Sequence, residues 1–267
     1  MSQKVGYTVR GQGEVRVPQL HEIRRALESA GHRTDLLGTD ESQSELASKL
    51  TEYFSFRARV LNTGVRDNLM DADSARDLFE AQVRRLAWQG SIPMNKQRGD
   101  KRTPAYLTAI VNMMVEEYRG QVPVDCDPHE LVTVSRGGFP VRTLARRMDG
   151  AFPSSCDPVA VWEVKEYYYT TTFGSRVADG VYETMLDGME LEELREHEGI
   201  DIKHYLMIDG RYTWWDCGRS YLCRLVDMLH MGLVDEVLVG RECAERLPGL
   251  VAEWVRTVEG RSAGVSA

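Results

Sequence analysis

The chain has 267 residues, 42% of them hydrophobic, which is enough for one large domain or for a domain with a smaller subdomain. No apolar run reaches the roughly 18 residues of a transmembrane helix, and the N-terminus lacks the apolar stretch of a signal peptide. The net charge of −8 argues mildly against nucleic acid as the partner, because phosphate binding depends on Lys and Arg.

Basic side chains nevertheless gather in two stretches. The first, residues 84–102, includes Lys101 and Arg102, and the second, residues 136–147, immediately precedes Asp149. Each stretch could line a local basic cleft, although scattered, solvated charge explains either one equally well. The five cysteines include no CxxC pair, so the sequence predicts neither a zinc knuckle nor a disulfide framework. It indicates a reduced, cytoplasmic protein.

The first hundred residues have mostly helical periodicity. Apolar residues recur at helical spacing in residues 17–30, 42–61 and 71–88. Asp40 or Ser42 is the expected N-cap of the second segment. Residues 90–103 are polar and basic and predict a loop.

A helix and then strands follow this loop. Thr103 is the expected cap of the helix, Pro104 its first residue and Gly120 its end. The expected strands are residues 131–134, 139–148, 159–171, 203–208 and 237–239. The expected helices are residues 176–196, interrupted near Gly188, and residues 218–231 and 243–258. Three consecutive strands suggest an antiparallel meander, and the later strand–helix alternation suggests added, partly parallel strands.

This order predicts an α/β fold, with a mixed sheet core flanked by helices and a helical N-terminal extension. We expect a mostly helical N-terminal region at residues 1–100, the sheet core at residues 101–260 and a flexible tail at residues 261–267. The sequence contains neither a P-loop nor a G-x-S-x-G elbow, which argues against ATP hydrolysis and against an α/β-hydrolase.

The stretch from Asp149 to Lys165 is the most informative part of the chain. Glu163 and Lys165 are two residues apart in an expected strand, so both side chains project to one face while Val164 points away. Asp149 closes the preceding strand, and a hairpin can bring it beside them. Two carboxylates and an ammonium suit a divalent metal and the activation of water. The alternative is a cross-strand charge pattern on a solvated sheet face.

The element order, with Asp149 and Glu163-Val164-Lys165 on its second and third strands, resembles the PD-(D/E)xK nuclease superfamily from about residue 104 to residue 239. Met148 stands where the motif has Pro. The resemblance implies a restriction-endonuclease-like fold and Mg²⁺-dependent hydrolysis of DNA phosphodiester bonds, with Mn²⁺ as a substitute. It also implies that Asp149, Glu163 and the Val164 carbonyl hold the metal, while Lys165 orients or deprotonates the attacking water.

Other residues compete for or extend this site. Asp157 is a rival for Asp149, but a residue six positions before Glu163 on a straight strand lies roughly 20 Å away. A turn is the other interpretation of Asp157, because Pro158 follows it. Glu117, on the helix before the strands, is a possible additional acid or an ordinary surface residue.

Four residues are candidate DNA contacts, and the twin tryptophans are not. Ser175 and Arg176 open a helix whose N-terminus suits a phosphate, and Lys101 and Arg102 add positive charge. Trp214-Trp215 is expected in the core rather than stacked on bases.

The resemblance favours a restriction or antiphage endonuclease that acts on double-stranded DNA as a homodimer, without a membrane. The alternatives are a catalytically silent nuclease-fold module that binds DNA, and a DNA repair nuclease.

Overall fold

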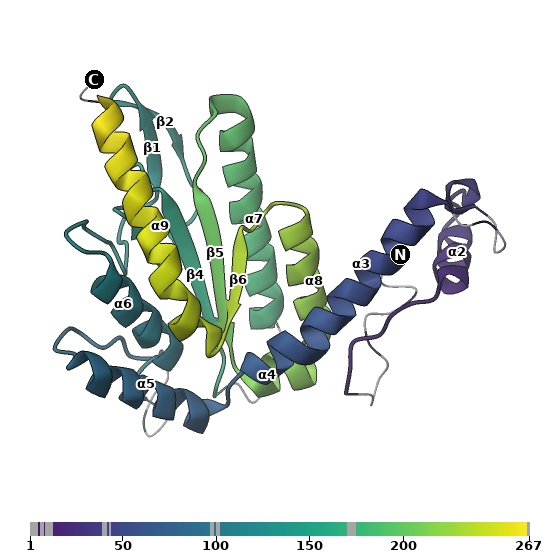
Figure 1. Ribbon diagram of the computed structural model, residues 1–267, viewed down its shortest axis with the longest axis horizontal. Helices are drawn as coiled ribbons and strands as arrows, with labels where there is room; N and C mark the ends of the chain where they lie inside the picture. Colours follow the sequence, from purple (N-terminus) through teal and green to yellow (C-terminus); the bar gives the residue numbers. More distant parts are fainter. Residues whose placement is uncertain are drawn as a thin grey trace.

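In the computed structural model, the main sheet carries helices on both faces (Figure 1). The structure describes residues 5, 8, 13–38, 42, 44–96, 99, 102–169 and 175–265. The helices of this part are α2 (Leu20–Ser29), α3 (Glu45–Val60), α4 (Arg66–Asn68), α5 (Ala72–Leu86), α6 (Tyr106–Tyr118), α7 (Ser175–Glu198), α8 (Arg219–His230) and α9 (Glu242–Val265). The strands are β1 (Thr133–Arg136), β2 (Phe139–Thr143), β3 (Gly150–Phe152), β4 (Ala160–Glu166), β5 (Lys203–Asp209) and β6 (Glu236–Val239). Two π-helical turns, Leu61–Val65 and Tyr212–Cys217, precede α4 and α8.

The main sheet has the strand order β3-β4-β5-β6. Strand β3 is antiparallel to β4, whereas β4, β5 and β6 are parallel and are connected through α7 and α8. The mixed α/β class is therefore confirmed. Among the described residues, none of the helices combines the length and hydrophobicity needed to cross a membrane.

The predicted three-stranded meander is wrong. Strands β1 and β2 form a separate antiparallel pair, and the segment predicted as one strand over residues 139–148 ends at Thr143. Phe139 and Val141 of β2 are exposed, while Leu144 and Met148 leave the strand and enter the core. The chain therefore turns after β2, and β3 begins only at Gly150.

The two faces of the main sheet bury different side chains. Trp162 and Met207 pack with α5, α6 and α9 on one face, and Leu206 and Ile208 pack with α8 on the other. Figure 1 shows α9 crossing the first face, with α6 beside it. Strand alternation produces this division, since neighbouring residues of β4 and β5 point to opposite faces.

Several predicted boundaries differ from the observed ones. Ser44 caps α3 through its hydroxyl, in place of Ser42; Asp40 lies outside the described residues. The N-cap residue of α6 is Ala105, so Thr103 does not cap this helix, and Pro104 forms a β-bridge with Met94. Gly120 follows the end of α6, with a φ of 61°, as expected.

Two helices are longer than predicted. Helix α7 is continuous at Gly188, because this residue packs against Leu233, whose carbonyl oxygen would overlap a Cβ at position 188. Helix α9 continues to Val265, beyond the predicted end at residue 258. Its Arg261 donates hydrogen bonds to the carbonyls of Asp157 and Pro158, which hold the last turns against the loop before β4.

Candidate functional site

Strand β4 presents Glu163 and Lys165 on the face that α7 covers. The Lys165 ammonium donates to Glu163 Oε2 at 2.6 Å and to Glu183 Oε2 of α7 at 2.9 Å. Glu163 is buried, with 1% of its side chain exposed, and Lys165 retains 13%. The solvated charge pattern considered from the sequence is therefore wrong for Glu163, because this carboxylate is enclosed by the protein.

The β3–β4 hairpin brings Asp149 beside this pair. Its backbone N–H donates to the Trp162 carbonyl at 3.1 Å, and its Oδ2 accepts the Val164 N–H at 2.8 Å. Asp149 is exposed and directly precedes β3, rather than ending the second strand as predicted. The hairpin that the sequence predicted between Asp149 and Glu163 is present, although it is made by β3 and β4.

The carbonyl of Val164 points toward Asp149. The N–H and C=O of one strand residue point to the same side, and the Val164 N–H is bonded to Asp149. The β3–β4 ladder ends at the pair formed by Gly150 and Trp162. No residue of β3 therefore stands opposite the Val164 carbonyl, and its oxygen faces the same space as the Asp149 carboxylate.

Arg146 is a central residue of the site that sequence reasoning missed. Its guanidinium lies 2.6 Å from Asp187 Oδ2, 3.2 Å from Glu163 Oε1 and 3.2 Å from Glu183 Oε2. Asp187 is fully buried. The sequence placed Arg146 in the basic stretch of residues 136–147, and a further signal is the spacing of Glu183 and Asp187, which lie four residues apart and hence on one face of α7.

Two buried oxygens of the site have no hydrogen-bond partner. They are Glu163 Oε1 and Asp187 Oδ1. The contact of Glu163 Oε1 with Arg146 is close enough for charge attraction, but it lacks the alignment of a hydrogen bond. A buried carboxylate oxygen without a donor is costly, so this atom is suited to accept a further cation or a donor group.

The donor set fits Mg²⁺ in kind. The Asp149 carboxylate, Glu163 Oε1 and the Val164 carbonyl are hard oxygen donors, which Mg²⁺ prefers, and it keeps waters in its remaining positions. Within the described ranges, however, no group of three or more His, Cys, Asp or Glu side chains has the arrangement of a complete metal site. Any ion there would rely on the carbonyl and on water to complete its shell.

The charges of the site shift the pKa values of its members. Burial disfavours the charged form of Lys165, but the nearby Glu163 outweighs it, and the pKa of Lys165 is raised. The pKa of Asp149 is raised, because nearby protein atoms displace part of its hydration shell although the residue is exposed, and because Glu163 is close. Burial raises the pKa of Asp187 to about 7. Lys165 therefore stays protonated at neutral pH.

A second pair of carboxyls, the half-buried Glu166 and the buried Asp209, face each other across β4 and β5. Glu166 Oε2 accepts the backbone N–H groups of Leu107 at 2.7 Å and Thr108 at 3.4 Å, so it caps the N-terminus of α6. Asp209 accepts the Met70 N–H at 2.7 Å. Burial raises the pKa of Glu166 and that of Asp209 to about 7 each.

Asp157 is a turn residue and not part of the site. Its carboxylate accepts the backbone N–H and the hydroxyl of Ser135, both at 2.6 Å, and its φ is 53°. Glu117 is exposed, while the neighbouring Glu116 is half-buried and paired with Arg119. The described contact between the site and α6 is made by Glu166, and it does not involve Glu117.

Two of the predicted DNA-contact residues, Arg102 and Arg176, have described side chains. Arg102 is exposed, and its backbone N–H donates to Gly99. Arg176 is exposed, and its carbonyl accepts the Tyr167 hydroxyl at 3.1 Å. Ser175 is the first residue of α7, but its side chain, like Lys101, lies outside the described residues.

The prediction that Trp214 and Trp215 belong to the core is confirmed, because both are buried. The Trp214 indole donates to the Lys165 carbonyl at 3.3 Å and supports β4 from the neighbouring turn.

Residues 70–254 match DUF7687, described as a domain of unknown function, and the chain therefore belongs to this family. Residues 1–64 match DUF7690, also described as a domain of unknown function. The two matches meet at the π-helical turn Leu61–Val65 and α4. Helix α5, which the sequence grouped with the N-terminal region, falls within the first match. No curated protein and no solved structure matches the chain.

Proposed function

We propose that this chain is a metal-dependent endonuclease of the PD-(D/E)xK type that hydrolyses phosphodiester bonds of double-stranded DNA. One observation carries the proposal. The Asp149 carboxylate is bonded to the backbone between Glu163 and Lys165, so all three charged groups meet at the hairpin. The mixed β3-β4-β5 arrangement, preceded by α6 and crossed by α7, is compatible with a restriction-endonuclease-like core.

Asp149, Glu163 and the Val164 carbonyl would hold Mg²⁺ in this proposal. Bound there, the ion would polarise the phosphate and lower the pKa of a coordinated water. Glu163 brings an oxygen without a hydrogen-bond partner, which supports its role as a ligand. Asp149 is exposed and accessible to DNA, whereas Glu163 is held in place by the protein.

Lys165 acts as a fixed positive charge. The two carboxylates bonded to its ammonium keep it protonated, so it stabilises negative charge that develops on the phosphate rather than removing a proton from water. This narrows the role inferred from the sequence, where deprotonation of water was also considered.

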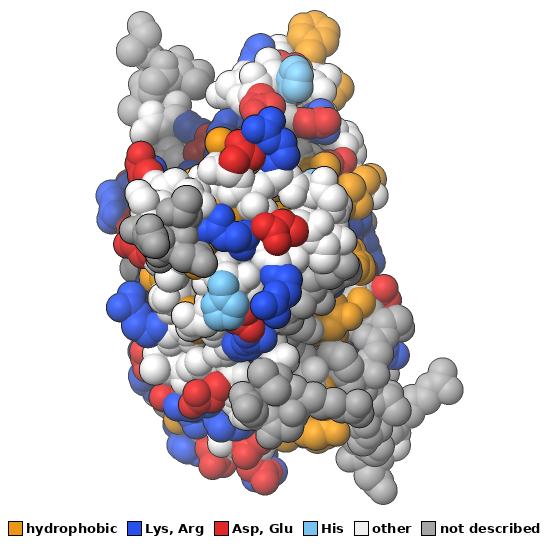
Figure 2. Space-filling model, turned by 90° about the vertical axis from the view of Figure 1, so that its right-hand side faces the viewer, with side chains coloured by type: hydrophobic (Ala, Val, Ile, Leu, Met, Phe, Trp, Pro, Cys, Tyr) orange, Lys and Arg blue, Asp and Glu red, His pale blue; other side chains and the backbone are white. Residues whose placement is uncertain are grey.

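With a net charge of −8, DNA binding in this proposal relies on a local basic surface. The face in Figure 2 carries Lys and Arg interspersed with Asp and Glu, so its described side chains form no extended basic surface. Arg102 and Arg176 are exposed and remain candidates for phosphate contacts. A homodimer could place two such sites on the two strands of a duplex, as expected for restriction or antiphage cleavage.

The test is cleavage of supercoiled plasmid and phage DNA, modified and unmodified, in Mg²⁺ or Mn²⁺. Glu163→Gln and Lys165→Met should abolish nicking and linearisation. Glu196→Gln and Lys49→Met are matched controls, because both residues are exposed and neither contacts the site. Wild-type protein that binds these DNAs and cuts none of them would refute the proposal.

A catalytically silent DNA-binding module is the second candidate, and one observation favours it. Arg146 and Lys165 place positive charge against both oxygens of Glu163, so this carboxylate is already neutralised without a metal. For such a module, no substrate would be cut, and Glu163→Gln would lower stability, because Lys165 and Arg146 lose a buried counter-charge, while the DNA affinity of the folded protein stays close to that of the wild type.

A further inference from the structure

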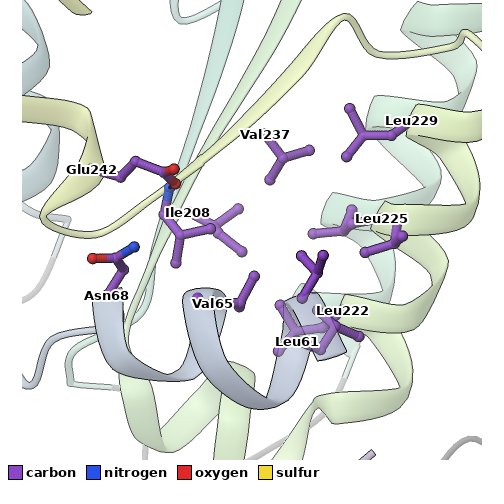
Figure 3. Close-up of a pocket in the computed structure, with 13 residues that line it drawn as sticks. Leu61, Val65, Asn68, Ile208, Leu222, Leu225, Leu229, Val237 and Glu242 are labelled. Carbon is purple, nitrogen blue, oxygen red and sulfur yellow. Dashed lines mark hydrogen bonds between the residues drawn. The ribbon is translucent and has the colours of Figure 1, made fainter. Parts of the chain in front are cut away.

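An apolar cavity lies on the opposite side of β5 from the β3–β4 hairpin. It has a volume of about 150 Å³ and is partly open to solvent, since Gly64 in its wall is exposed. Its walls come from the π-helical turn Leu61–Val65, from Leu222, Leu225 and Leu229 of α8, and from Ile208 and Val237 of the sheet. Figure 3 shows these side chains converging on one space between the helices and the sheet edge. The cavity thus sits where the two family matches meet.

Its apolar walls make this space unsuitable for ordered water. A buried water needs two to four polar partners, and aliphatic side chains supply none, so the apolar part of the cavity does not suit ordered water and can take a group about the size of benzene. Protein cores are otherwise packed to crystal density, and an empty space costs stability. A bound apolar group would recover the lost contacts.

One end of the cavity is polar. Asn68 and Glu242 lie at this end in Figure 3, opposite the leucines of α8. Glu242 Oε2 accepts the Val239 N–H at 3.2 Å, which fixes the carboxylate at the start of α9. A carboxylate and an amide at the rim of an apolar space suit a ligand with a donor-bearing, positively charged head group.

We propose that this cavity binds a small amphiphile, with an apolar body about the size of a benzene ring and a primary ammonium that meets Glu242 and Asn68. The ligand would touch Ile208, the residue of β5 that pairs with Lys165 of β4. It would also touch the turn Leu61–Val65, so its binding would stabilise the contact between α3–α4 and the sheet.

The test compares benzylamine with toluene and benzoate, using methyl NMR and the thermal unfolding midpoint of the full chain. Benzylamine should shift the methyl signals of Leu225, Leu229 and Val237 and raise the midpoint by mass action. Its dissociation constant should be at least about tenfold lower than those of toluene, which lacks the ammonium, and of benzoate, whose charge is repelled by Glu242.

Three variants test the roles of Glu242 and of the apolar space. Glu242→Gln should remove the preference for benzylamine over toluene, and Glu245→Gln, an exposed residue of the same helix, should keep it. Val237→Phe should fill the space and abolish binding of both. Methyl signals that respond to neither benzylamine nor toluene would overturn the proposal, as would benzoate binding as tightly as benzylamine. Because these readouts use no DNA, they are independent of the proposed nuclease activity.

Discussion

Val164 donates its backbone N–H to Asp149 Oδ2 at 2.8 Å, fifteen residues back along the chain. This bond continues the β3–β4 pairing with a side chain where the ladder of β3 has ended. It fixes the first acid of the proposed site relative to the strand that carries Glu163 and Lys165. Asp149 therefore has a structural role in addition to its proposed role in metal binding.

Asp149→Asn separates these two roles. The amide keeps an oxygen for the Val164 N–H, so the free energy of unfolding should stay within about 1 kcal/mol of the wild type. DNA cleavage should fall at least about a hundredfold, because the variant loses a negative metal ligand. Urea denaturation and plasmid cleavage measure the two effects.

The free energy of unfolding of Asp149→Ala should be about 1 kcal/mol lower than that of Asp149→Asn, since the Val164 N–H then lacks its acceptor. Asp127→Asn, at an exposed position, is the control. An Asp149→Asn enzyme that cuts at the wild-type rate would exclude Asp149 as a ligand.

Arg146→Met tests the buried charges behind the strand. Removing the guanidinium leaves the fully buried Asp187 without its cation, so we expect a loss of about 3–5 kcal/mol at pH 8. The loss should shrink toward pH 5, where Asp187 takes up a proton. Arg142→Met, which breaks a pair with the exposed Glu193, should cost about 0–1 kcal/mol.

The double variant Arg146→Met with Asp187→Leu completes this comparison. It removes both charges, and stability at pH 8 should recover most of the loss of the single variant. If the double variant is as unstable as Arg146→Met alone, the cost does not come from the unpaired Asp187.

Local patterns predicted the elements whose signals lie within a few residues. Gly120 marks the end of α6, and a continuous apolar run, Tyr205 to Ile208, marks β5, as observed. The Asp149–Glu163 hairpin was also predictable, because a turn-rich loop separates two apolar runs. The separate pairing of β2 was not, since its exposed residues alternate like those of a core strand and only tertiary packing excludes it from the main sheet.

The long-range polar contacts of the site could not be predicted from local sequence patterns, for the same reason. Arg146 meets Asp187 across 41 residues, and Glu166 caps α6 across 59. These contacts depend on how α6 and α7 pack on the sheet, which no spacing in the chain encodes. The prediction that Thr103 caps α6 was wrong, because the Glu166 carboxylate from β4 supplies the acceptor instead.

Stability should fall as pH rises through the weakly acidic range. Burial raises the pKa of Asp209 to about 7, whereas an unfolded Asp titrates near 3.9. Between about pH 4 and pH 7, the folded chain therefore holds a proton that the unfolded chain has lost, and the free energy of unfolding decreases as pH rises. Glu166 and Asp187, whose pKa values are also raised to about 7, contribute in the same direction.

Asp209→Asn should make this pH dependence shallower and raise stability at pH 8. The asparagine oxygen can still accept the Met70 and Gly210 N–H groups, and its amide can donate to Tyr168. Urea denaturation at pH 5, 6, 7 and 8 measures the slope. Asp216→Asn, at an exposed position, should leave the slope unchanged. Equal slopes for wild type and Asp209→Asn would contradict the raised pKa.

Gly150→Ala should damage the site without altering any charged residue. A Cβ at position 150 would overlap the ring of Trp162, which stacks on Trp254 at 5.6 Å between ring centroids. Neither buried ring has room to move. We therefore expect the free energy of unfolding to fall by about 1–3 kcal/mol and the adjacent Asp149 to be displaced. Cleavage should fall in parallel with the loss of the Asp149–Val164 hydrogen bond, which the NMR signal of the Val164 amide reports.

Gly249→Ala is the matched control. Gly249 lies in α9 with open space where a Cβ would stand, and alanine there should stabilise the helix by about 0.5–1 kcal/mol. If both alanine variants have wild-type stability and activity, close packing of β3 on Trp162 does not hold Asp149 in place.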